Sequence, residues 1–152
     1  MKALSLHQPW ATLVILGIKR IESRSWSTDH RGTIFVHAAD KQSRELIELC
    51  HEEPFRTALR AAGIHKWQDL PRKAVLGTVE LDDCRKIVCA GASLDPHSLA
   101  MTPPAEPELS FGRYDPGRFA WMLDRPNKFN IPILHPGRQR LFNIHPQALG
   151  LQ

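Results

Sequence analysis

The chain has 152 residues, of which 42% are hydrophobic and 24% charged, and this ordinary globular composition excludes disorder over the whole length. The length suits a single domain, 1–152, and the longest apolar stretch, residues 11–18, is far short of the ~20 residues that a membrane span needs. The first ten residues lack the pattern of a secretion signal, and the three cysteines argue against a disulfide framework. We therefore expect a cytoplasmic protein with no membrane partner, while the sequence leaves its oligomeric state open.

The net charge of +4 is distributed unevenly along the chain. Residues 1–39 carry a net charge of +3 and residues 110–152 a net charge of +4, whereas residues 40–109 carry −3. If the two ends meet in space, they form a basic surface that an anionic partner could use. The alternative is a solvated surface on which basic residues cluster by chance.

Two strands and one helix are expected within the first 26 residues. Residues 2–6 and 18–26 have the composition of short strands. Between them, Pro9 suits the first position of a two-turn helix, and Gly17 is able to end it with a positive φ.

The next stretch predicts a strand followed by two helices. Residues 33–37 alternate so that Ile34 and Val36 share one face. Asp40 is expected to cap a helix that starts at residue 41, and Pro54 either ends this helix or begins a second one.

The second half of the chain combines strands with one long loop. Residues 90–117 contain five prolines and few periodic apolar positions, which indicates either a functional loop, such as a lid that is mobile until a ligand binds, or a partly disordered segment. Strands are predicted at 73–81, 85–89, 118–123, 131–134 and 139–144, the last two as a pair around Pro136.

These strands do not alternate regularly with helices, which disfavours a doubly wound sheet. The pattern instead predicts an α+β protein: a small, mostly antiparallel β-barrel with flanking helices.

Many of the side chains that could bind a ligand lie in the N-terminal part of the sequence. Lys19, Arg20, Arg24 and Arg31 can bind phosphate oxygens, and Glu22 can accept from a base amino group or orient Arg24. The flat side chains on which an unpaired base could stack are Trp10, Trp26 and Tyr114. The structural alternatives are that Trp10 and Trp121 belong to the core and that Glu22 and Arg24 form only an ion pair.

Other kinds of site find little support in the sequence. The histidines and cysteines lack zinc-like spacing, so no metal ligands are expected. Glycine motifs for phosphate or dinucleotide binding and a serine nucleophile motif are also missing, and we expect no cofactor.

Three ordered blocks of sequence resemble the ASCH domain family of the PUA-like superfamily, in particular its bacterial and phage members. The first block contains Gly17, Lys19, Glu22 and Arg24 at the family's spacing, the second is Phe111–Leu123, and the third is Pro136–Phe142. The resemblance covers nearly the whole chain and implies a PUA-like barrel that binds RNA or a nucleotide in a cleft beside the helices.

The residues and the resemblance together suggest roles for particular side chains. Lys19 and Arg24 would bind phosphate, Glu22 would read a polar edge or orient the cations, and Trp26 or Tyr114 would stack on a base. Gln8, Trp10 and His37 would line the pocket, and Arg118 and Arg138 would extend its basic surface.

One similar branch of the superfamily hydrolyses the acetyl amide of N4-acetylcytidine with a lysine, a threonine and a glutamate. Lys19 matches the lysine and Glu80 could match the glutamate, but Glu22 stands at the threonine position. Because Glu22 stabilises a charged lysine, it opposes the use of Lys19 as a base.

Three functions therefore stay open. The first is an RNA- or nucleotide-binding domain without chemistry of its own. The second is an enzyme on the same cleft, either a ribonuclease or an amide hydrolase on a modified nucleoside, with Lys19 and Glu80 as its catalytic residues. The third is a protein-interaction module whose contact segment is Pro96–Pro107.

Overall fold

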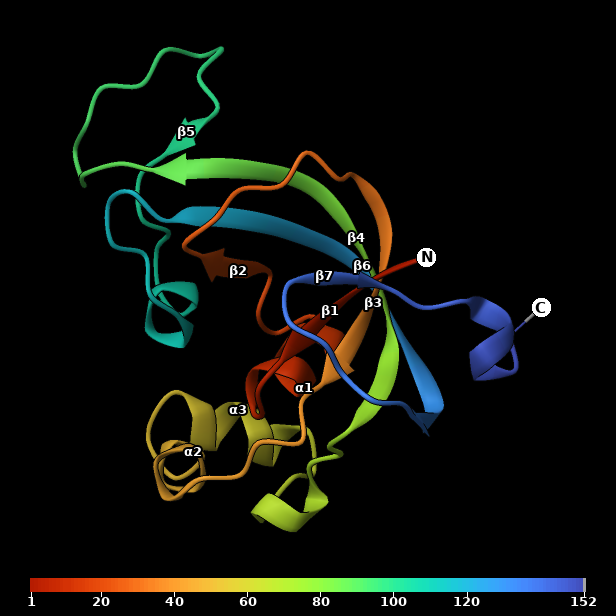
Figure 1. Cartoon of the computed structure of the whole chain (residues 1–152). Helices are drawn as coiled ribbons and strands as arrows, with labels where there is room; N and C mark the ends of the chain where they lie inside the picture. Colours follow the sequence, from red (N-terminus) through yellow and green to blue (C-terminus); the bar gives the residue numbers. More distant parts are fainter. Residues whose placement is uncertain (152) are drawn as a thin grey trace.

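The computed structural model describes residues 1–151, and its main feature is one strongly curled sheet that forms an open half-barrel (Figure 1). The hydrogen-bonded order of its main strands is β2-β6-β4-β3-β1-β7, and β5 pairs with β4. Neighbouring strands are antiparallel except for the β1–β3 and β4–β5 pairs, which are parallel. The strands are β1 (Lys2–Leu6), β2 (Ile21–Arg24), β3 (Gly32–Ala38), β4 (Ala74–Ile87), β5 (Ala100–Met101), β6 (Phe119–Leu134) and β7 (Leu141–Asn143).

Short helices flank this sheet, which confirms the predicted α+β fold with a mostly antiparallel PUA-like barrel. The α-helices are α1 (Trp10–Ile15), α2 (Arg44–Leu49) and α3 (Phe55–Ala61). Short 3-10 turns lie at Trp67–Asp69, Glu108–Phe111 and Pro146–Leu149.

Helix α1 joins the sheet to the other helices because it is apolar on two faces. Ala11, Val14 and Ile15 pack into the main core with residues of β1, β3, β4 and β6. Leu13 faces the other way and packs against Phe55 and the second core around α2 and α3. The five residues after Trp10 are all buried, so α1 fills the concave side of the half-barrel.

The strand faces follow the predicted alternation. Ile34 and Val36 of β3 lie in the main core, whereas Phe35 packs on the opposite side with Phe142. Trp121 of β6 is fully buried in the main core, as its apolar alternation indicated.

The long strands differ from the sequence prediction. Residues 74–87 form one continuous strand, β4, and residues 119–134 form another, β6, where shorter strands were expected. Irregularities in the β4–β6 pairing bend both strands and let them continue around the curl. The predicted pairing of 131–134 with 139–144 is wrong, since Ile133 pairs with Val75 of β4 and Phe142 pairs with Ala3 of β1.

The start of α2 is also a correction. Asp40 does not cap this helix; the helix begins at Arg44, and the side-chain oxygen of Ser43 accepts a hydrogen bond from the Leu46 amide at 3.3 Å. Ser43 is an equally good cap, and its extended backbone conformation fits that position.

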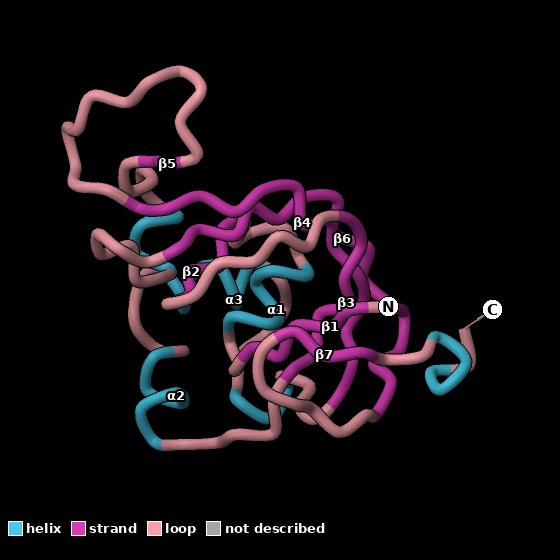
Figure 2. Tube along the Cα trace, turned by 45° about the horizontal axis from the view of Figure 1, so that its top comes forward, coloured by secondary structure: helices cyan, strands magenta, loops and turns pink. Residues whose placement is uncertain are grey.

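The proline-rich stretch 90–117 is not uniform. Its first part projects from the body of the molecule, with the short strand β5 at its base (Figures 1 and 2). Its second part turns back onto β2 through the Glu108–Phe111 turn, because Glu108 Oε2 accepts a hydrogen bond from the Arg20 amide at 2.9 Å.

The half-barrel stays open between β2 and the β1–β7 edge, and we call this opening the seam. Within residues 1–151, β2 pairs with β6 only. Side chains bridge the seam: Arg24 Nη2 donates to the Ser5 carbonyl at 3.0 Å, and the Arg140 guanidinium lies 5.3 Å from the centre of the Trp26 ring.

Candidate functional site

A cavity of about 470 Å³ lies at the seam, between β2, the β1–α1 turn, the helices and the returning segment 110–113. Its lining includes apolar residues, namely Leu6, Trp10, Trp26, Leu49, Phe55 and Phe111. The polar and charged lining residues are Ser5, His7, Lys19, Glu22, Ser23, Arg24, Ser25, Ser110, Arg113 and Arg118.

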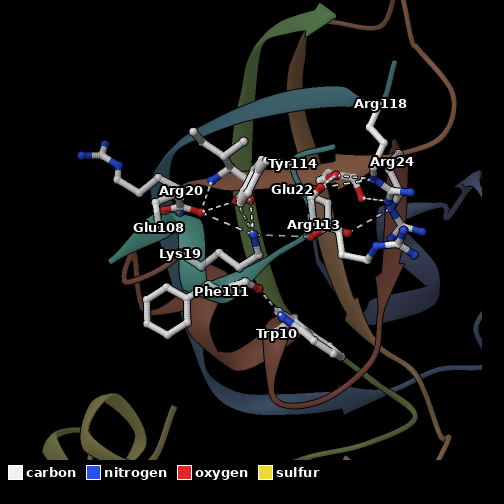
Figure 3. A network of polar contacts seen from close by, with 12 residues as sticks. Trp10, Lys19, Arg20, Glu22, Arg24, Glu108, Phe111, Arg113, Tyr114 and Arg118 are labelled. Carbon is white, nitrogen blue, oxygen red and sulfur yellow. Dashed lines mark hydrogen bonds and ion pairs between the residues drawn. The ribbon is translucent and has the colours of Figure 1, made fainter. Parts of the chain in front are cut away.

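Aromatic side chains form one end of the cavity. The rings of Trp10 and Phe55 are edge to face with centres 6.0 Å apart, and Phe55 packs on Phe111 at 5.2 Å. Trp10 Nε1 donates to the Phe111 carbonyl at 2.6 Å, which ties the returning segment to α1 (Figure 3). The indole N–H is thus satisfied, and the half-buried ring contributes a flat apolar wall.

Arginine side chains form the other end (Figure 3). Arg118 Nε and Nη2 donate to the hydroxyl and the carbonyl of Ser23 at 2.8 and 3.0 Å. Arg118 Nε also lies 3.2 Å from the Arg113 carbonyl. All these acceptors are neutral, and no carboxylate within residues 1–151 pairs with Arg118, so its charge is available to an anion.

Lys19 lies at the floor between the two ends and is only 2% exposed. Its ammonium group donates to the Ile21 carbonyl and lies 3.1 Å from the Tyr114 hydroxyl and 3.4 Å from Glu108 Oε1. Burial of a charge is costly unless partners surround it, and these three oxygens satisfy the ammonium. Lys19 is therefore a structural cation of the site.

An alternating chain of charges links Lys19 to the arginine end. Glu22 Oε2 lies 4.0 Å from Lys19 Nζ, and Glu22 Oε1 lies 3.1 Å from Arg24 Nε (Figure 3). The Arg24 contact lacks hydrogen-bond geometry, and Arg24 Nε has no hydrogen-bond partner within residues 1–151. Glu22 thus acts as the shared carboxylate between two cations.

Tyr114 completes the polar floor. Burial is the main cause that raises the pKa of Tyr114, and the negative charge of Glu108 raises it further. The phenol therefore keeps its proton, which serves one of two acceptors at 3.0 Å, the Ile21 carbonyl or Glu108 Oε1. Its oxygen accepts from Lys19, and Tyr114 is only 5% exposed, so little of its ring is open to a base.

The pKa of His7, which lines the cavity, is sensitive to the charges around it. Burial lowers the pKa of His7, and the positive charges of Lys41 and Arg24 lower it further. A positive potential at this position is what an anionic ligand would bind.

The structure brings many of the predicted site residues together. Trp10, Lys19, Glu22, Arg24, Trp26 and Arg118 all line the cavity, and Tyr114 lies directly behind Lys19.

Four predicted residues lie elsewhere. Gln8 is buried and holds the backbone of Thr12 and Pro71, and His37 bonds Ser5 and the His135 carbonyl. Arg138 is exposed on the segment before β7. Glu80, the predicted catalytic partner of Lys19, pairs with Thr33 across the β3–β4 ladder and does not line the cavity.

Sequence reasoning missed the residues that the returning segment supplies. The sequence pattern places Glu108 in the long proline-rich loop without giving it a role, whereas its carboxylate accepts from Lys19 and from the amides of Arg20 and Ile21. Phe111 and Arg113 lay in a recognised block, but their side chains were not singled out. A signal that could have pointed to Glu108 is Lys19 itself. A buried lysine needs a carboxylate close by, and Glu22, the carboxylate of the same motif, does not satisfy it alone.

Metal-binding clusters and membrane-spanning helices are not found within residues 1–151. No cluster of three or more histidine, cysteine, aspartate or glutamate side chains there could hold a metal ion. None of the helices in this range has the length and apolar character to cross a membrane.

The curled half-barrel with its flanking helices has the α+β architecture of a PUA-like domain. Residues 4–132 match the sequence model of the ASCH domain, and the chain belongs to this family.

Over 83 residues the chain is 43% identical to "Activating signal cointegrator 1" of Mus musculus, a match that covers 53% of this chain and 14% of the relative. The protein of the same name from Homo sapiens matches with the same identity and coverage. The chain thus corresponds to a small part of these relatives.

Proposed function

We propose that this domain binds a nucleotide of single-stranded RNA in the seam cavity, with the base at the aromatic end and phosphate at the arginine end. The observation that carries the proposal is the presence of both ends in one cavity (Figure 3). Nucleotides join a flat apolar base to an anion, and few other common ligands need both surfaces at once.

The dimensions of the cavity support this proposal. Sites for small ligands and cofactors have volumes of about 300–1,000 Å³ and combine apolar walls with a few polar groups. A volume of about 470 Å³ falls in the lower part of that range. It suits one unpaired nucleotide, whereas a duplex would bind on a wider surface.

The charges support an anionic ligand. The basic residues that line the cavity are Lys19, Arg24, Arg113 and Arg118, and the acidic residue in its lining is Glu22. Lys19 is already satisfied by its partners, and Arg113 pairs with Asp115 at 3.2 Å. Arg118, bound only to neutral oxygens, is the strongest candidate to bind phosphate.

The aromatic residues differ in what they can offer. Trp10 and Trp26 are half-buried and line the cavity, and a base that stacks on either ring would gain about 1–3 kcal/mol. We therefore propose Trp10 and Trp26 as the stacking residues.

The contacts of Lys19 and the position of Glu80 support binding rather than catalysis as the proposed function. Lys19 is held by three oxygens in the arrangement of a structural ammonium, and Glu80 lies outside the cavity. The lysine–glutamate pair of the amide hydrolase alternative is therefore not assembled.

The test is fluorescence-anisotropy binding of a labelled eight-nucleotide RNA without terminal phosphate, at two salt concentrations. Wild type, Arg118→Ala and the control Arg60→Ala are compared, since Arg60 has no salt bridge within residues 1–151 and lies away from the cavity.

We expect salt-sensitive binding by wild type and Arg60→Ala. Arg118→Ala should bind about 10- to 100-fold more weakly, because a hydrogen bond to a charged group contributes about 1.5–3 kcal/mol. Equal binding by all three proteins, or none by wild type at low salt, would refute the proposal. A gel of the same samples shows whether the RNA is cut, which would favour the enzyme alternative.

A further inference from the structure

We propose that the RNA-binding surface continues out of the cavity, over Trp26 and onto Arg140 and Arg138, so that the ligand is a strand of at least two nucleotides. This inference rests on the proposed function and adds the path of the strand. One nucleotide occupies the cavity, and the phosphate of its neighbour binds the segment Pro136–Arg140, which we call the basic segment.

The basic segment is packed against the seam beside the cavity. Gly137 lies so close to β1 and β3 that a Cβ there would be 2.4 Å from His37 Cε1 and 3.1 Å from Ser5 Oγ. The carbonyl of the same Ser5 accepts the hydrogen bond from Arg24. The basic segment and the arginine end of the cavity therefore meet at one residue of β1.

Arg140 reaches the cavity wall itself. Its guanidinium lies 5.3 Å from the centre of the Trp26 ring, and Trp26 lines the cavity. Trp121 packs edge to face against Trp26 at 4.6 Å and fixes that ring. A ligand that leaves the cavity along Trp26 meets Arg140 next.

The backbone of Arg140 is unusual. Its φ is +58°, in the left-handed region that residues other than glycine rarely adopt. Such strain gathers at binding sites, where the surrounding structure maintains it. Here it directs an arginine to the seam at a position where glycine would be the easier choice.

The distribution of ion pairs separates these arginines from the rest. Of the thirteen arginines in the chain, nine form salt bridges with aspartate or glutamate within residues 1–151. The four without such a partner in this range are Arg60, Arg118, Arg138 and Arg140. Three of these four lie in the cavity or on the basic segment, so the uncompensated guanidinium charge is concentrated where the strand would run.

The experiment measures affinity against the length of the ligand. The probes are a mixture of the four nucleoside monophosphates and mixed-sequence single-stranded RNAs of two, four and eight nucleotides, each competing with a labelled eight-nucleotide RNA. The variants are Arg140→Gly, which suits the positive φ, Arg140→Lys, which keeps the charge, and the control Arg60→Ala. Thermal unfolding of each variant confirms that it is folded.

We expect wild type and Arg60→Ala to bind the four-nucleotide RNA at least tenfold more tightly than the monophosphates. Arg140→Gly should lose most of this gain while its affinity for monophosphates stays within twofold of wild type, and Arg140→Lys should keep part of the gain. The slope of log affinity against log salt should fall by about 0.7 for the one phosphate contact that is lost.

Two results would overturn the inference while the proposed function stands. In the first, RNA binds but Arg140→Gly behaves like wild type at every length. In the second, Arg140→Gly weakens monophosphates and RNA by the same factor, which places Arg140 within the cavity site. If wild type binds no probe, the proposed function fails and this inference fails with it.

Discussion

At the scale of single residues, Lys19 is notable because its charge is buried, and burial of a charge has a large desolvation penalty. We expect Lys19→Ala to lower the free energy of unfolding by about 3 kcal/mol, since it leaves Glu108 and Glu22 partly buried without their cation. Urea unfolding followed by circular dichroism measures this loss. Arg118→Ala, which removes no partner from a carboxylate, should lower it far less.

A second variant separates lost charge balance from lost packing. Adding Glu108→Gln to Lys19→Ala removes the orphaned carboxylate and should restore part of the stability. If the double variant is less stable than Lys19→Ala, or if Lys19→Ala unfolds at the wild-type urea concentration, then Lys19 does not have this structural role.

His7 allows a prediction about pH and binding. Burial and the charges of Lys41 and Arg24 lower the pKa of His7 in the free protein. A phosphate bound near Arg24 would stabilise the imidazolium and raise this pKa, so binding should tighten as the pH falls through the pKa of His7 in the complex.

An NMR titration of His7, with and without saturating RNA that lacks terminal phosphates, checks the prediction. His7→Asn should remove most of the pH dependence of the dissociation constant. An unchanged pKa of His7 in the complex would place the phosphate elsewhere.

The sequence indicated several of the individual residues that line the cavity. The spacing from Lys19 to Arg24 placed those side chains in one short segment, and the cavity includes them. Gln8 and His37 lie outside the cavity lining, because a polar side chain near a motif can equally bond to the backbone, as both do here. Glu108 was missed because it is 89 residues from Lys19 in the chain, and local patterns carry no such distance information.

At the scale of elements, the close approach of β4 and β6 depends on Gly77. Its φ is +154°, and a Cβ there would lie 2.2 Å from the Asn127 carbonyl oxygen. We expect Gly77→Ala to destabilise the protein by more than 2 kcal/mol, because backbone of the partner strand must move. Gly63→Ala is the control: its φ of +78° adds strain, but no atom lies within 4 Å of the new methyl group. Thermal unfolding that shifts equally in both variants would contradict this prediction.

The positions of the strands were predicted better than the pairing between them. Alternation located β1, β3 and the start of β6, since each has one face in the main core. The pairing of β7 with β1 could not be predicted, because proximity in sequence favoured a hairpin around Pro136. The full length of β4 and β6 could not be predicted either, because irregularities in their pairing interrupt the alternation of apolar and polar residues that marks a strand.

At the scale of the whole molecule, His37 connects three parts of the sheet. Nδ1 lies 2.9 Å from the Ser5 hydroxyl, and Nε2 lies 2.8 Å from the His135 carbonyl, so β3 is tied to β1 and to the residue after β6. Burial lowers the pKa of His37, so the unfolded chain takes up a proton at a higher pH than the folded protein.

The stability that neutral His37 provides is therefore present at neutral pH and lost as the pH falls below about 6.5, the ordinary histidine pKa, toward the lower folded value. Urea unfolding between pH 7.5 and 5 should show this loss, and His37→Asn should reduce the slope. The exposed His97 provides the control, since His97→Asn should leave the slope as in wild type. A slope that His37→Asn does not change would assign the loss to other groups.

The pairing of β1 with both β3 and β7 affects how the molecule acquires its structure. The main chain of Met1 donates to the Ile144 carbonyl across 143 positions, and Ala3 pairs with both Phe35 and Phe142. During synthesis β1 is made before β7, so its outer edge stays uncovered until β7 is available to pair with it. Until then the nascent sheet exposes an unpaired edge that favours association with other chains, and the pairing of β7 removes this site of aggregation.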